Sequence, residues 1–71
     1  MSVPIGSRLG EVLRLSRAER GLGQEQLAVA LGVRQQTVSR WEHGIAVPRP
    51  GRVVALAALL DLEPACLHRL A

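Results

Sequence analysis

Arginine is the residue type in this chain that is best suited to chemistry with a charged partner. All nine basic residues are arginines, against six acidic residues, so the formal net charge is +3. Residues 1–52 hold eight arginines and four glutamates, whereas residues 53–71 hold one arginine and two acids. The guanidinium group presents a rigid fork of donors that suits phosphate groups and guanine edges. This distribution fits an N-terminal two-thirds that faces a polyanion, and charge alone leaves a solvated surface as the alternative.

Residue constellations for catalysis or metal binding are missing from the sequence. No nucleophile has a nearby base, no carboxylates form a pair, no glycine-rich loop could cradle phosphate, and His43 and His68 are isolated. The single cysteine, Cys66, has no partner for an internal disulfide, and no Cys/His cluster has metal-ligand spacing. We therefore expect neither an enzyme nor a metal or other cofactor, and we interpret Cys66 as a buried, inert thiol.

Length and hydropathy limit the architecture. A chain of 71 residues makes one domain at most, here 1–71, with a modest core of its own. No secretory signal is recognisable at the N-terminus, and the longest apolar run, 53–60, is far shorter than the roughly 20 residues that cross a bilayer. We expect a cytoplasmic protein without a membrane span.

Apolar residues recur at helical spacing throughout, and the absence of an alternating strand pattern predicts an all-α fold. The buried face of a first helix, which ends at Gly21, consists of Ile5, Leu9, Val12 and Leu13. The pattern predicts a second helix from about residue 24 up to Gly32, a third over about 35–42, a fourth over about 51–60, and a short fifth that opens at Glu63 and Pro64.

Residues 24–42 have the spacing of two helices that cross steeply over a tight turn. Ala28 falls where the helices approach closely, and Gly32 falls in the turn, where a positive φ is easy only for glycine. The residues expected to fill the space beneath are Leu27, Leu31, Val33, Val38 and Trp41. The polar residues displayed on the opposite side of the third helix are Gln35, Gln36, Ser39 and Arg40. The segment 24–42 therefore predicts a helix-turn-helix core.

These residues, taken in order, resemble the lambda-repressor-like (Cro-like, Xre) helix-turn-helix proteins of phages and bacteria. The resemblance is carried by residues 14–22, 24–28, 31–33 and 37–44, by Pro48, and by residues 56–60. It implies a compact five-helix DNA-binding domain whose third helix lies in the major groove. The implied function is a sequence-specific transcriptional regulator, with repression the expected mode.

The resemblance also implies contacts for individual residues. Gln35 and Gln36 would bond to adenine edges, and Arg40 would reach guanine or a phosphate. Two smaller residues, Thr37 and Ser39, would contact a thymine methyl or a phosphate. The residues implied to bind phosphates are Gln24, Arg49 and Arg52. An exposed helix face with good helix propensity is the alternative for the glutamines, and solvated charge is the alternative for Arg49 and Arg52.

Two features of the family pattern, an ion pair and the helix caps, bear on stability. The family commonly joins its first and third helices by an ion pair, which here would link Arg17 and Glu42. Arg34 stands before the third helix, where a capping Ser or Thr is usual, and Gly23 is a milder departure before the second helix. The Arg34 side chain cannot accept hydrogen bonds from helix amides, which costs about 1 kcal/mol. We therefore hypothesise that Arg34 contacts the DNA backbone or a groove edge.

The fourth helix is apolar nearly all round, and four other short helices cannot cover it completely. We expect a two-fold homodimer that binds an inverted-repeat operator. The interface candidates are Leu56, Leu59, Leu60, Leu62, Leu67 and Leu70. The alternative for this apolar face is that the chain is a fragment of a longer regulator.

A protein-interaction module is the competing function. The same fold serves as an antitoxin or a regulator that contacts a toxin or the transcription machinery. A purely protein-binding version would be expected to lose the polar face of the third helix. This chain keeps that face, which favours DNA.

Overall fold

The computed structural model describes residues 5–63 and 65–67, and the regular structure in these residues is entirely helical. Four helices follow one another: α1 (Ile5–Glu19), α2 (Gln24–Leu31), α3 (Gln35–Glu42) and α4 (Pro50–Leu60). A further short helical stretch covers residues 65–67. The expected all-α fold with five helical segments is confirmed. α4 begins at Pro50, slightly earlier than expected, because proline suits the first helical turn.

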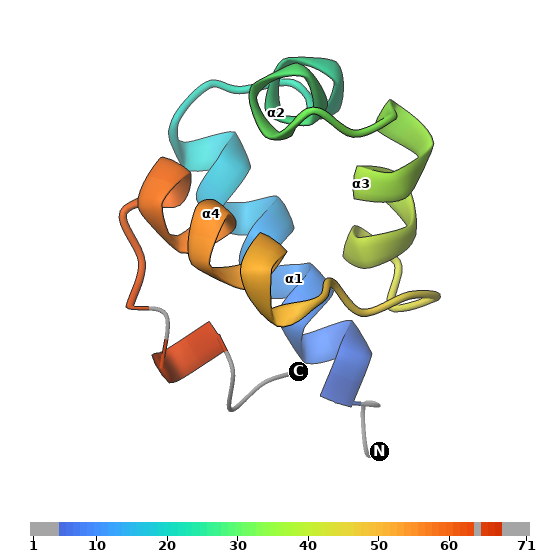
Figure 1. Cartoon of the computed structure of the whole chain (residues 1–71), viewed down its shortest axis with the longest axis vertical. Helices are drawn as coiled ribbons and strands as arrows, with labels where there is room; N and C mark the ends of the chain where they lie inside the picture. Colours follow the sequence, from blue (N-terminus) through green and yellow to red (C-terminus); the bar gives the residue numbers. More distant parts are fainter. Residues whose placement is uncertain (1–4, 64, 68–71) are drawn as a thin grey trace.

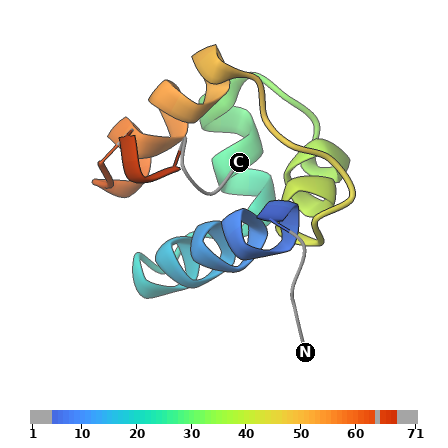
Figure 2. The ribbon, with the colours of Figure 1, turned by 90° about the horizontal axis from the view of Figure 1, so that it is seen from below.

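The helices enclose a common interior. α2 is seen nearly end-on while α3 runs down the side of the molecule, so their axes cross steeply (Figure 1). α3 packs against both α1 and α2, and α4 packs against the same two helices. In the view from below, α1 and α4 lie on opposite sides of the molecule (Figure 2). Among the described helices, none covers the outer face of α3.

One face of each helix supplies the core. The buried apolar residues are Leu9, Leu13, Leu27, Ala28, Leu31, Val38, Trp41, Val53, Leu56, Ala57, Leu60 and Leu67. They include Ala28, Val38 and Trp41 of the predicted helix-turn-helix core, while Val33 is partly buried against the cluster. Leu9 and Leu13 confirm the predicted buried face of α1; the side chain of Ile5 lies outside the described part of the structure.

The turn between α2 and α3 depends on Gly32. This residue ends α2 with a φ of 70°, in the left-handed region that residues with a Cβ rarely adopt. Its own N–H donates to Val29 O, and the next N–H, that of Val33, donates to Ala28 O at 3.0 Å. These two bonds satisfy carbonyls that the end of the helix would otherwise leave without partners. The predicted role of Gly32 is confirmed.

Gly10 marks a close approach of α1 to the end of α3 that sequence analysis did not predict. A Cβ at this position would lie 2.5 Å from Glu42 O and even closer to Trp41 O. Both obstacles are backbone atoms, so a side-chain rotation cannot relieve the clash. Gly10 therefore sets the distance between the two helices and, with it, the position of α3.

Three of the predicted dimer-interface residues belong instead to the core of the single chain. Leu56, Leu60 and Leu67 are at most 1% exposed, because α1 and α2 cover the face of α4 on which the first two lie. These residues cannot touch a second subunit, so their assignment to the interface was wrong. Leu59 is 40% exposed and Leu62 is partly buried. Leu70 lies outside the described residues.

Three further observations concern features outside the core. Cys66 is exposed, so the prediction of a buried thiol was wrong. Among the described residues, no three His, Cys, Asp or Glu side chains are grouped so that they could hold a metal ion. Within the same part of the chain, no helix combines the length and the apolar character needed to cross a membrane.

Candidate nucleic-acid interface

α3 is anchored by its apolar side and presents its polar side outward. Val38 and Trp41 are 1% and 5% exposed, whereas Gln35, Gln36 and Arg40 are all exposed. Because a helix repeats every 3.6 residues, burial of positions 38 and 41 turns the exposed positions away from the core. Thr37 and Ser39 are partly buried at the flanks of the exposed face. The structure thus brings together the five residues that the resemblance assigned to base reading.

Arg34 precedes α3 in an extended conformation, with φ −80° and ψ 150°, and its side chain makes no capping hydrogen bond. The predicted loss of a side-chain cap is therefore confirmed. The residue is exposed, and within the described part of the chain no ion pair of Arg34 is present. Its guanidinium group is available to a partner beside the first turn of α3.

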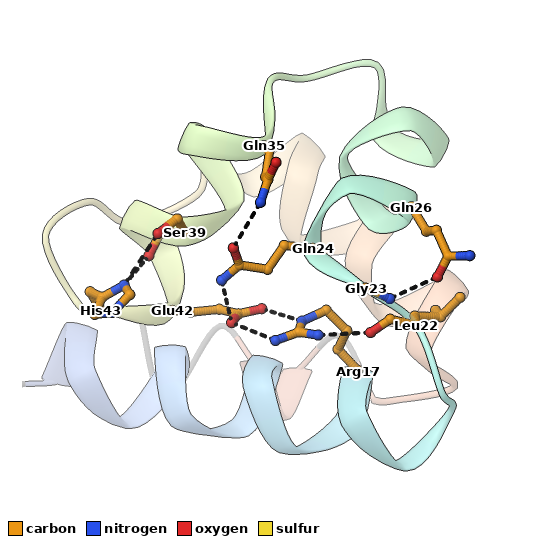
Figure 3. Close-up of polar contacts among 9 residues, drawn as sticks. All are labelled: Arg17, Leu22, Gly23, Gln24, Gln26, Gln35, Ser39, Glu42 and His43. Carbon is orange, nitrogen blue, oxygen red and sulfur yellow. Dashed lines mark hydrogen bonds and ion pairs between the residues drawn. The ribbon is translucent and has the colours of Figure 1, made fainter.

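An ion pair joins α1 to the end of α3, as the resemblance implied. Arg17 Nε donates to Glu42 Oε2 at 2.6 Å, and Arg17 Nη2 donates to Glu42 Oε1 at 3.0 Å (Figure 3). The Glu42 side chain is only 2% exposed and that of Arg17 is 15% exposed. Arg17 also donates from Nη1 to Leu22 O at 2.7 Å, which ties down the loop before α2. The pair therefore holds three segments of the chain together.

The environment of Glu42 keeps its carboxyl group ionised. Burial acts to raise the pKa of Glu42, but the hydrogen bonds from Arg17 and Gln24 and the positive charge of Arg17 outweigh burial, so the pKa lies below its ordinary value. The hydrogen bond to Glu42 likewise raises the pKa of Arg17. Glu42 therefore carries its negative charge in the folded protein at neutral pH.

Gln24 links this ion pair to the exposed end of α3. Its Nε2 donates to Glu42 Oε1 at 3.0 Å, and its Oε1 accepts a bond of 3.5 Å from Gln35 Nε2 (Figure 3). The resemblance implied only a phosphate contact for Gln24, and these two bonds were not predicted. No signal in the sequence shows them, because they depend on the side chain at the start of α2 reaching both ends of α3.

The His43 side chain contacts both the backbone and the side chain of Ser39, in the last turn of α3. Its Nδ1 lies 2.7 Å from Ser39 O, and a carbonyl only accepts, so Nδ1 carries the proton and donates. The Ser39 hydroxyl lies 3.4 Å from the same nitrogen. Ser39 therefore already has a neighbour within the chain, whereas no side-chain hydrogen bond of Gln36 or Arg40 is found among the described residues.

A shallow depression separates the middle of α3 from the start of α4. Its volume is about 360 Å³, and it is lined by Val33, Thr37, Trp41, Val47, Pro48, Arg49 and Arg52. Arg52 donates from Nη1 to Leu31 O at 2.6 Å, so one of its N–H groups caps the end of α2. Two arginines and Thr37 thus line this depression together with four apolar residues, beside the exposed polar face of α3.

Comparison with known protein families bears on this arrangement of helices and charges. The model of a family described as "Helix-turn-helix domain" matches residues 8–70, which is most of the chain. The chain belongs to the helix-turn-helix domain family. Membership indicates a DNA-binding protein, in agreement with the steep crossing of α2 and α3 and the polar face of α3. A search of curated protein sequences gives no match to this helix-turn-helix domain.

Proposed function

We propose that this helix-turn-helix domain is a sequence-specific transcriptional regulator of the lambda-repressor-like (Xre) type, which reads double-stranded DNA by placing α3 in the major groove. The observation that carries the proposal is the exposed face of α3, where amide and guanidinium groups project from a helix anchored by Val38 and Trp41. These groups have the donors and acceptors that distinguish base pairs in the major groove.

The polar residues have two proposed roles, base reading and phosphate binding. Gln35, Gln36 and Arg40, flanked by Thr37 and Ser39, read base edges. Arg34 and Arg49 contact phosphates on either side of α3, and both are exposed. Arg52 has N–H groups beyond the one bound to Leu31 O, and a guanidinium with five donors can also serve a phosphate. Gln24 adds a phosphate contact at the start of α2, where helix amides favour anions.

We further propose that the protein acts as a homodimer and a repressor. The exposed side of α4 carries Val54 and Leu59, which are 53% and 40% exposed. This side is the remaining candidate for a two-fold contact, together with the partly buried Leu62. Two such subunits would place two copies of α3 in successive major grooves, so the operator would be an inverted repeat with half-sites about 34 Å apart.

The test is selection of binding sites from a randomised duplex library by the purified protein at two salt concentrations. We expect an inverted-repeat motif and an affinity that falls steeply with salt, because arginines that neutralise phosphates release counterions. The motif selected by an Arg40→Ala variant should lack base preference at one or two positions and otherwise match the wild-type motif. Absence of binding at both salt concentrations would contradict the proposal and favour a module that binds another protein.

A further inference from the structure

The depression between α3 and α4 combines apolar residues with cations. Its volume of about 360 Å³ lies at the small end of the range for small-molecule sites, which is roughly 300–1,000 Å³. The turn before α3, α3 itself, the loop before α4 and the start of α4 all contribute to it. The lining residues are Val33, Thr37, Trp41, Val47, Pro48, Arg49 and Arg52. Four of these seven residues are apolar, two are cationic and none is acidic.

The two arginines give the depression a positive charge. Neither Arg49 nor Arg52 forms an ion pair within the described part of the chain. Arg52 donates from Nη1 to Leu31 O at 2.6 Å, so this bond holds its guanidinium group in place while the other N–H groups remain for a ligand. Arg49 is exposed, and its side chain makes no capping hydrogen bond. The depression therefore suits an anionic group.

The apolar lining distinguishes this depression from a site for phosphate alone. A phosphate group is bound by charge and hydrogen bonds, and apolar neighbours add nothing to its affinity. Trp41 is 5% exposed and Val47 is 49% exposed, so an apolar ring in the depression would bury the remaining surface of Val47. A guanidinium group also stacks on flat aromatic rings. Together these features favour an aromatic ring that carries a carboxylate.

We propose that this depression binds a small aromatic carboxylate, and that the bound molecule releases the protein from DNA. This inference rests on the proposed function, which assigns Arg49 and Arg52 to DNA phosphates. A carboxylate held by the same two guanidinium groups withdraws them from the phosphates. Ligand and DNA therefore compete, and each lowers the affinity of the protein for the other. The DNA-binding domain itself then responds to a small molecule.

Binding is tested first on the free protein, with phenylacetate as the probe. The chain has one tryptophan, so the indole N–H of Trp41 gives a single NMR signal. We expect phenylacetate to shift this signal at millimolar concentrations, which suit a ligand of so few atoms. Phenylacetamide lacks the charge and acetate lacks the ring, so both should shift the signal far less. Equal effects of the three compounds, or no effect of any, would overturn the inference.

Two pairs of variants locate the bound probe. Val47→Ser should weaken phenylacetate binding roughly fivefold, because about half of a valine side chain is left for the ligand to bury. Ile45→Ser is its matched control, since Ile45 is 74% exposed in the same loop but does not line the depression. Arg49→Gln should weaken binding at least about tenfold, through loss of a charged hydrogen bond. Arg34→Gln is the control for charge, because Arg34 also precedes a helix without a capping bond.

The same variants can contradict the inference. If Val47→Ser and Arg49→Gln bind phenylacetate as tightly as their controls do, the probe lies elsewhere and the inference fails.

Competition is tested with the duplex selected from the randomised library. Phenylacetate at roughly ten times its Kd should raise the apparent Kd for DNA about tenfold, and acetate at the same concentration controls for ionic strength. Val47→Ser keeps both arginines, so it should keep its affinity for DNA and respond less to phenylacetate. Phenylacetate binding without a change in DNA affinity would overturn the inference and leave the proposed function intact. A protein that binds no duplex would overturn the proposed function and the inference with it.

Discussion

The Cα of Gly10 faces the backbone carbonyl of Glu42 so closely that a Cβ on the glycine would lie 2.5 Å from that oxygen. Gly10→Ala should therefore force α1 and α3 apart and destabilise the fold by about 3 kcal/mol, the upper part of the range for overpacked cores. For a domain of this size we expect the midpoint of thermal unfolding to fall by more than 10 °C, at roughly 4–8 °C per kcal/mol.

The matched control for this change is Gly51→Ala in the first turn of α4. Nothing lies within 4 Å of a Cβ at Gly51. Alanine lowers the conformational freedom of the unfolded chain and favours the helix, so this variant should be more stable than wild type by roughly 0.5–1 kcal/mol. Equal unfolding midpoints for the two variants would contradict the close approach at Gly10.

Removal of the Glu42 carboxylate should destabilise the protein strongly. Glu42→Ala leaves Arg17 only 15% exposed and without its charged partner, and loss of one member of a buried pair costs about 3–5 kcal/mol. That is a large share of the roughly 5–15 kcal/mol that stabilises a typical domain. Chemical denaturation of the variant measures the change. An unchanged free energy of unfolding would show that the pair contributes nothing to stability.

The same pair predicts how stability depends on pH. The pKa of Glu42 is lower in the folded chain than in the unfolded chain, where it is about 4.3. Ionised Glu42 therefore stabilises the fold above that unfolded value, and the contribution is lost as the pH falls through the folded pKa. Wild type should lose more stability below about pH 5 than Glu42→Gln does. Parallel curves of unfolding free energy against pH for the two proteins would refute this.

Replacement of Arg34 by serine should raise the stability of the fold and lower the affinity for DNA. Arg34→Ser restores a side chain that can accept a bond from the first amides of α3, which should stabilise the domain by about 1 kcal/mol. The same change removes a cation from the proposed phosphate contacts. Affinity for all sequences should fall, and the slope of log K against log salt should flatten by about 0.9. If affinity is unchanged, Arg34 is only a tolerated surface residue.

Leu56 and Leu59 should respond differently to substitution. Leu56 is 0% exposed, so Leu56→Ala leaves a cavity and should cost about 3 kcal/mol of stability. Leu59 is 40% exposed, and Leu59→Glu should change stability far less but weaken the proposed homodimer. Sedimentation of both variants at several concentrations measures association. A monomeric wild type at all concentrations would rule out the dimer.

The helix-turn-helix core was predictable from sequence because each of its constraints is local. Gly32 supplies the left-handed residue of the turn, and Val38 and Trp41 lie one turn apart, so they indicate the buried face of α3 wherever the neighbouring helices lie. The Arg17–Glu42 pair followed only from the resemblance, since nothing in the spacing of two residues 25 apart along the chain brings them together.

The wrong assignments and the features that were not predicted have one cause in common. Both depend on how the helices pack against one another, which the sequence alone does not show. α4 is apolar on most sides, so its sequence does not show that the side with Leu56 and Leu60 faces α1 and α2 while Leu59 does not. For a glycine inside a helix, such as Gly10, the sequence shows only a low helix propensity. The need for a residue without a Cβ becomes visible only when the neighbouring backbone is known. Gln24 was assigned one contact because its two bonding partners lie 11 and 18 residues away.

Three arginines donate to backbone carbonyl oxygens that follow or end helices: Arg17 to Leu22 O, Arg52 to Leu31 O, and Arg20 to Leu60 O at 3.0 Å. These guanidinium groups act as internal clamps, because a planar fork can serve a carbonyl with one N–H and a carboxylate with others. Lysine offers no such fork. An engineer who exchanges arginine for lysine to adjust solubility should therefore spare these three positions and begin with Arg8, whose exposed side chain holds no helix end in the described part of the chain.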